Sequence, residues 1–123
     1  MAIKLNPGRQ YPLVLEQAFT ADDLDGTNAV VAAKLPRDAI ILRGHISVTK
    51  AFSAGTIGVG VTGAATAYGS LNTATLGIKA LTATGTPVGA SELKLTPSAA
   101  LTGGEATLVV EYIIAGRANE AQP

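Results

Sequence analysis

The sequence predicts an all-β protein built as a single β-sandwich, with a jelly-roll-like arrangement favoured. Apolar and polar residues alternate with a period of two in segment after segment, which is typical of half-buried strands. Clusters of Gly, Pro, Asp and Ser separate these segments at short intervals, and no stretch keeps a helical period. At 123 residues the chain has the length of one domain. About seven or eight strands at this spacing favour a sandwich.

Two segments carry the clearest alternation, at residues 39–50 and 105–114. In the first, one face is expected to hold the apolar residues Ile40, Leu42, Ile46 and Val48. Its other face is expected to hold Arg43, His45, Ser47 and Thr49. In the second, Leu108, Val110, Tyr112 and Ile114 share a face opposite Thr107, Val109, Glu111 and Ile113. Both faces of this second strand are partly apolar, which predicts cover on both sides.

Shorter strands are predicted at residues 13–19, 28–35, 56–62, 75–81 and 91–96. In the last of these, Leu93 and Leu95 are expected to point inward. A short helical turn is predicted near residues 21–24, where Thr20 can cap the first turn.

The sandwich is expected to span residues 13–116, between an extended N-terminal arm at 1–12 and a C-terminal tail at 117–123. The arm contains Pro7, Gly8 and Pro12 and shows little alternation. Its start lacks the apolar stretch of a signal peptide. No apolar run approaches the roughly 20 residues of a membrane helix, so we expect no membrane partner.

The charge composition argues against nucleic-acid binding, because 9 Lys and Arg are balanced by 9 Asp and Glu. Charged residues make up only 15% of the chain, against about 25% in typical soluble domains. Such a surface either faces other protein or is a neutral surface of Ala and Thr, and composition alone favours neither. With no cysteine, thiol chemistry and disulfides are excluded.

The segment Gly58-Val59-Gly60-Val61-Thr62-Gly63 matches the spacing of a dinucleotide-binding loop. That chemistry requires a helix opening at the last glycine, and no helical pattern follows. A strand whose outer face meets a close neighbour explains these glycines better.

The acidic residues Asp22, Asp23 and Asp25 suggest a calcium loop, but their spacing favours an ordinary acidic turn. His45 is the only histidine, and we expect it on the outward face of its strand. The sequence therefore predicts no catalytic residue, no cofactor and no metal site. A carbohydrate-binding module is a weaker alternative, which an exposed Tyr68 would favour.

Three segments resemble small virion proteins of tailed bacteriophages, those known as capsid decoration or cement proteins. They are AFT at 18–20 with LPRDAII at 35–41, VTKAFSAGT at 48–56 and LVVEYIIAGR at 108–117. The resemblance implies a trimeric sandwich, made in the host cytoplasm, that sits on the capsid surface. There it would bind the major capsid protein, clamp neighbouring coat subunits and resist internal pressure. A tail-tube, fibre or head-completion protein would show many of the same features.

Interface positions are expected in two places. The arm offers the aliphatic and basic side chains of Ile3, Lys4, Leu5 and Arg9. On the strands, the outer apolar positions are Ile41, Val109 and Ile113. These three are expected to divide between a second layer of the same domain and a neighbouring subunit of a homotrimer.

Overall fold

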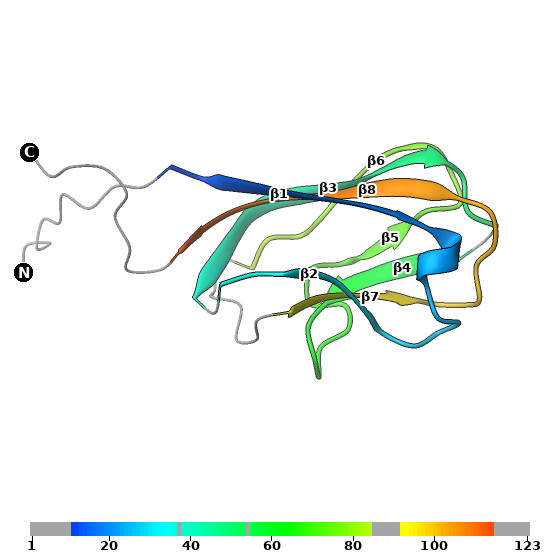
Figure 1. The fold of residues 1–123 in the computed structure, drawn as a ribbon, viewed down its shortest axis with the longest axis horizontal. Coiled ribbons are helices and arrows are strands. Elements are labelled where there is room, and N and C mark those ends of the chain that lie inside the picture. Colours follow the sequence, from blue (N-terminus) through cyan, green and yellow to red (C-terminus); the bar gives the residue numbers. More distant parts are fainter. Residues whose placement is uncertain (1–10, 37, 54, 85–91, 115–123) are drawn as a thin grey trace, which may run out of the picture.

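The chain folds into two stacked antiparallel sheets of four strands each, as Figure 1 shows for this computed structural model. The structure describes residues 11–36, 38–53, 55–84 and 92–114. Sheet I has the strand order β1-β8-β3-β6, and sheet II has the order β2-β7-β4-β5. The strands are β1 (Leu13–Thr20), β2 (Val30–Lys34), β3 (Ala39–Lys50), β4 (Thr56–Gly60), β5 (Ser70–Asn72), β6 (Gly77–Ala80), β7 (Glu92–Pro97) and β8 (Glu105–Ile114). The predicted all-β sandwich is therefore confirmed.

The strands pair as a nested hairpin. β4 pairs with β5, β3 with β6, β2 with β7 and β1 with β8, all antiparallel. The ladders β3–β8 and β4–β7 then join the pairs side by side within each sheet. A 3-10 helix, η1 (Ala21–Asp23), links β1 of sheet I toward β2 of sheet II, where the sequence predicts a helical turn. No helix in the described ranges is long and apolar enough to cross a membrane.

Strands β3 and β8 begin and end at the predicted residues, and five others differ from the prediction by a few residues at their ends. The sequence does not reveal β5, because three residues are too few for an alternation to be recognised. Residues 1–10 and 115–123, which make up most of the predicted arm and all of the predicted tail, lie outside the described residues. The predicted division into arm, sandwich and tail therefore stays a prediction.

The expected faces of β3 are wrong in its first half. Ala39 and Ile41 are buried, with 0% and 2% of their surface exposed, whereas Leu42 is 38% exposed. The register with β8 shifts between Ile41 and Arg43, which marks a β-bulge. One extra residue inverts the alternation on one side of the bulge, so Ile46 and Val48 point inward as predicted while Ile40 and Leu42 do not. Ile41 therefore belongs to the core of its own domain.

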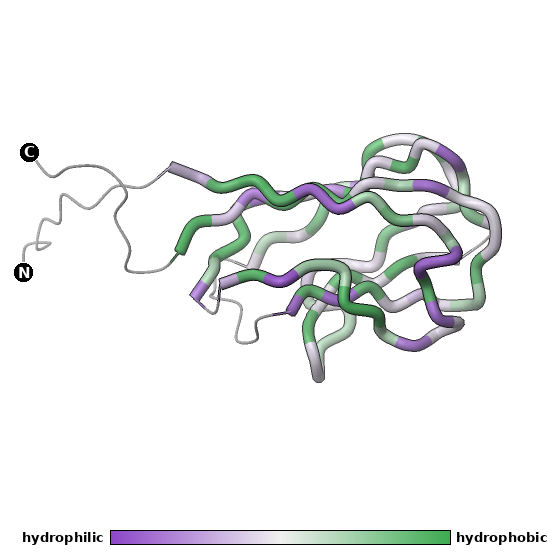
Figure 2. The backbone as a smooth tube through the Cα atoms, viewed as in Figure 1, coloured by the Kyte–Doolittle hydropathy of each residue, from purple (hydrophilic) through white to green (hydrophobic). Residues whose placement is uncertain are grey.

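The core lies between the sheets and is filled by the inner faces of β3, β4, β7 and β8. Figure 2 shows apolar and polar residues following one another along these strands. The largest fully buried aliphatic side chains are Ile41, Ile46, Ile57, Leu93, Leu95, Leu108, Val59 and Val110. Each contributes about 1.5 to 3 kcal/mol to the free energy of unfolding. The inward orientation predicted for Leu93 and Leu95 is confirmed, and Leu108 and Val110 lie on one face, as predicted.

One flank of the sandwich is bridged and the opposite flank is not. On the bridged flank, the chain after β6 links the sheets, because Leu81 N–H donates to Gly44 of β3 and Thr82 N–H donates to Tyr68 O, at 2.8 and 2.9 Å. On the other flank, the edge strands β1 and β2 have no ladder or backbone hydrogen bond between them in the described residues. This flank is where the two sheets part.

The glycines of β4 face their own hairpin. Gly58 and Gly60 lie on the outer face of sheet II, opposite Thr96 and Lys94 of β7. A Cβ added at Gly60 would overlap the carbonyl oxygen of Ala64 and lie 2.6 Å from the carbonyl carbon of Ala65. The close neighbour expected from the sequence is thus the chain between β4 and β5, folded back over the sheet. No helix follows β4, so no phosphate-binding loop forms here.

We expect Gly60→Ala to lower the free energy of unfolding by about 3 kcal/mol, because the added methyl group meets backbone that cannot rotate away. Gly63→Ala is the matched control in the same hairpin. At Gly63, φ is +83° and nothing lies within 4 Å of an added Cβ, so only backbone strain of about 1 kcal/mol is expected. Denaturant unfolding of both variants measures the difference. Equal losses at the two positions would contradict the close packing over Gly60.

Candidate functional site

The acidic residues after β1 serve as local caps. Thr20 N–H donates to Asp23 Oδ2 at 2.8 Å, which ties the end of β1 to η1. Asn28 N–H donates to the backbone oxygen of Asp25 at 2.8 Å and closes the following turn. No group of three or more His, Cys, Asp and Glu side chains in the described part of the chain is arranged to hold a metal ion. The geometry agrees with an ordinary acidic turn.

His45 lies on the outer face of sheet I, as expected. Its cross-strand partners are Val109 of β8 and Ala80 of β6. One step along the sheet, Arg43 and Glu111 stand opposite each other, with Arg43 Nε 3.1 Å from Glu111 Oε2. The Arg43 side chain is 76% exposed, so this ion pair contributes little to stability, at most about 1 kcal/mol. None of these groups forms the chain of hydrogen-bonded partners that nucleophilic catalysis needs.

The predicted interface residues fall into three groups. Val109 and Ile113 are half-buried on the outer face of sheet I, on the same face as His45 and Glu111. Ile41 lies in the core. Ile3, Lys4, Leu5 and Arg9 lie outside the described residues, so their assignment stays a prediction. Of the three strand positions, Val109 and Ile113 therefore remain on the outer face of sheet I, beside charged and polar side chains, and Ile41 does not.

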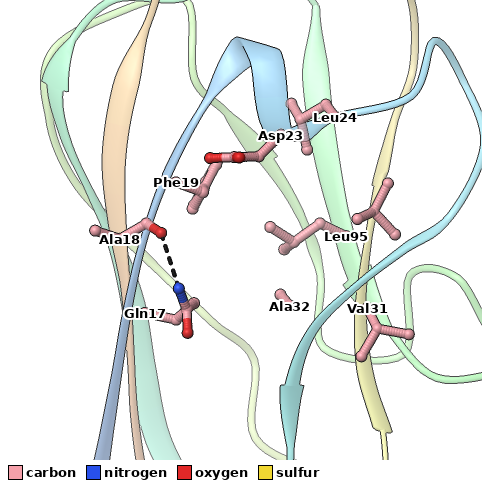
Figure 3. Close-up of a pocket in the computed structure, with 9 residues that line it drawn as sticks. Gln17, Ala18, Phe19, Asp23, Leu24, Val31, Ala32 and Leu95 are labelled. Carbon is pink, nitrogen blue, oxygen red and sulfur yellow. Dashed lines mark hydrogen bonds between the residues drawn. The ribbon is translucent and has the colours of Figure 1, made fainter.

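A groove that the sequence does not reveal opens between β1 and β2 on the flank where the sheets part (Figure 3). Its volume is about 400 Å³, within the range of about 300 to 1,000 Å³ usual for binding pockets. Gln17, Phe19, Leu24, Val31 and Leu95 are among the residues that line it. The lining is mainly aliphatic and aromatic, with Gln17 and Asp23 as its polar side chains. The groove thus offers apolar side chains together with the polar groups of Gln17 and Asp23.

The edge strands β1 and β2 carry three large apolar residues that are exposed. Leu13, Val14 and Val31 have 39%, 59% and 43% of their surface exposed, and Val31 also lines the groove. Clusters of exposed apolar side chains mark interaction sites more often than isolated ones do. No sequence pattern reveals this surface, because it depends on which strands lie at the edges of the sheets.

Tyr68 is buried, with 4% of its surface exposed, and its backbone pairs with Val59 of β4. The exposed ring that a carbohydrate-binding module would need at this position is therefore absent. Burial raises the pKa of the Tyr68 phenol above its ordinary value of 10.0, and a hydrogen bond with Thr84 partly offsets this effect. The Tyr68 side chain thus ties the hairpin after β4 to the chain after β6.

Because the pKa of Tyr68 is raised in the folded state, its contribution to stability is complete below pH 10 and is lost as the pH rises through the folded pKa. We expect Tyr68→Phe to be less stable at neutral pH by about 1 kcal/mol, since the hydrogen bond with Thr84 is lost. Above pH 10 its stability should fall less steeply than that of the wild type. Urea unfolding across this pH range measures both effects, with Tyr11→Phe as the control for tyrosine number. Parallel pH profiles of wild type and Tyr68→Phe would refute this assignment.

The fold is similar to that of a chain in the cyanophage Pam1 capsid asymmetric unit, with a TM-score of 0.52. The match covers 92% of this chain and 94% of that chain, at 20% sequence identity. The two chains share a fold. No model of a known protein family and no curated protein matches the sequence.

Proposed function

We propose that this chain is a virion structural protein of a tailed phage, a capsid decoration or cement protein that binds the assembled head. The observation that carries the proposal is the fold shared with a capsid chain over nearly the whole length of both proteins. It agrees with the resemblance of the sequence to decoration proteins. In this role the protein would bind the major capsid protein, sit on the capsid surface and stabilise contacts between neighbouring coat subunits.

The connectivity supports a jelly-roll sandwich, the arrangement that the sequence favours. Jelly rolls have eight strands in two sheets, formed by wrapping a long hairpin. The nested pairs β1–β8, β2–β7, β3–β6 and β4–β5 are this long hairpin, and the ladders β3–β8 and β4–β7 wrap it into two sheets. Double-sheet jelly rolls of this kind are common in viral capsids.

The surface supports a role in assembly. Charged residues are scarce over the whole chain, and apolar residues are exposed along the flank between β1 and β2. Val109 and Ile113 add a half-buried apolar contribution on sheet I. Interfaces are depleted in charge in the same way. We propose a homotrimer whose N-terminal arm, residues 1–12, reaches the coat or an adjacent copy.

Adding the purified protein to phage heads that lack it tests this function. We expect saturable binding at regular capsid positions, seen by electron microscopy, and a higher temperature of head disruption. Binding to tails alone would instead favour a tail-tube or fibre protein. Binding to neither particle would overturn the proposed virion role.

The arm gives a second test. Deleting residues 2–10 should lower the affinity for heads by about tenfold, which corresponds to about 1.4 kcal/mol. Burial of Ile3 and Leu5, about 3 to 5 kcal/mol together, does not by itself cover an ordering cost of about 1 to 2 kcal/mol per residue, so backbone pairing must supply the remainder and the net loss is modest. Deleting residues 118–123 is the control for loss of a terminal segment. Undiminished occupancy and heat resistance without residues 2–10 would show that the sandwich alone clamps the coat.

A further inference from the structure

β1 is the least protected of the four edge strands of this sandwich. Natural edge strands are blunted by short length, Lys or Pro residues, or bulges. β5 has only three residues, β6 has four and includes Lys79, and β2 has a register shift between Val31 and Ala33 and ends at Lys34. β1 has eight residues with an unbroken register to β8, and it contains no Lys and no Pro. Such an edge is a template for pairing with another strand.

The backbone groups that β1 offers can be identified from its hydrogen bonds. Thr20 N–H bonds Asp23 Oδ2, so the backbone of Thr20 points away from β8. Alternate residues of a strand point the same way, which places the N–H and C=O groups of Val14, Glu16 and Ala18 on the free edge. The C=O of Ala18 accepts a hydrogen bond from Gln17 Nε2 at 3.0 Å. Among the residues that the structure describes, no partner is present for the edge groups of Val14 and Glu16 or for the N–H of Ala18.

The charge along this edge restricts its partner. Glu16 lies on the edge itself, and the exposed carboxylates Asp22, Asp23 and Asp25 follow it in the connection to β2. Antiparallel pairing of β1 with β1 of a second copy, centred on Glu16, would set the two Glu16 carboxylates opposite each other, and like charges destabilise cross-strand neighbours. The suitable partner is a strand that carries positive charge on its outer face and aliphatic side chains on its inner face.

We propose that β1 is a strand-acceptor site and that its occupant is residues 2–6 of a second copy of this chain. In residues 1–12 the charged side chains are Lys4 and Arg9, both opposite in sign to Glu16. Ile3 and Leu5 are two residues apart, as required for side chains that share one face of a strand.

One antiparallel register satisfies these conditions together. It sets Lys4 directly opposite Glu16 at a hydrogen-bonded position of the free edge. Ile3 and Leu5 then stand opposite Gln17 and Leu15, on the inner side of sheet I where the groove between β1 and β2 opens. Their aliphatic side chains would cover this groove, and each strand position would add backbone hydrogen bonds.

The contact joins two different surfaces, the arm of one copy and β1 of the next. Contacts of this type close into rings when the rotation between copies permits it. This contact between the arm and β1 supplies an interface for the proposed homotrimer, and it does not depend on binding to a phage head. It is tested on the purified full-length protein alone, so its failure and the failure of the proposed function can be distinguished.

A charge exchange tests the register, with self-association measured by sedimentation velocity. Lys4→Glu and Glu16→Lys should each weaken self-association by about tenfold, because each sets like charges opposite one another. The double variant should return within about threefold of the wild type. Lys94→Glu makes the same charge change on β7 and should leave self-association unchanged. Failure of the double variant to recover would overturn the pairing of Lys4 with Glu16.

A second variant removes one hydrogen-bond donor from the free edge of β1 without changing the charge. Ala18→Pro deletes an N–H that points away from β8, so the ladder with β8 keeps its hydrogen bonds while strand addition loses one. We expect weaker self-association with an unchanged circular dichroism spectrum. A monomeric wild type would overturn the inference. The inference would also be overturned if Lys4→Glu lowered the stability of the protein equally at all concentrations and Glu16→Lys restored it. That result would mean that the arm pairs with β1 of its own chain.

Discussion

A sandwich of two open sheets has four strand edges, and each edge must have its backbone hydrogen-bonding groups paired or be protected from unwanted partners. This constraint explains much of the described structure. On the flank of β5 and β6, the edges are short, and the chain after β6 ties the sheets together through Gly44 and Tyr68. On the flank of β1 and β2, the sheets part, and a long edge strand lies beside a groove. The two flanks thus have opposite properties.

The strands could be predicted from sequence because alternation and turn residues are local signals. The buried face of the first half of β3 could not be predicted. Residues 39–42 are all apolar, so the sequence of residue types does not reveal the bulge. The inner face of β7 could be predicted, because Lys94 separates the buried Leu93 and Leu95. The buried face of a strand could thus be predicted where apolar and polar residues alternate, and it could not be predicted where the strand is uniformly apolar.

Part of the candidate site was visible in the sequence and part was not. The glycines of β4 indicated a close neighbour, although the neighbour proved to be the chain's own hairpin at Ala64 and Ala65. The scarcity of charge left open both a surface that faces other protein and a neutral surface of Ala and Thr, and it could not tell where an interface would lie. Its place depends on β1 and β2 being edges, and strand order follows from pairings between residues far apart in sequence.

The two hydrogen bonds that close the far end of β1 limit how much strand it can accept. Gln17 occupies the C=O of Ala18, and Asp23 occupies the N–H of Thr20, so the open ladder ends near Ala18. The open ladder on β1 is therefore short. A longer strand laid along it would leave its own N–H and C=O groups without partners beyond Ala18. The edge thus selects a short added segment and rejects a full-length strand of another sheet.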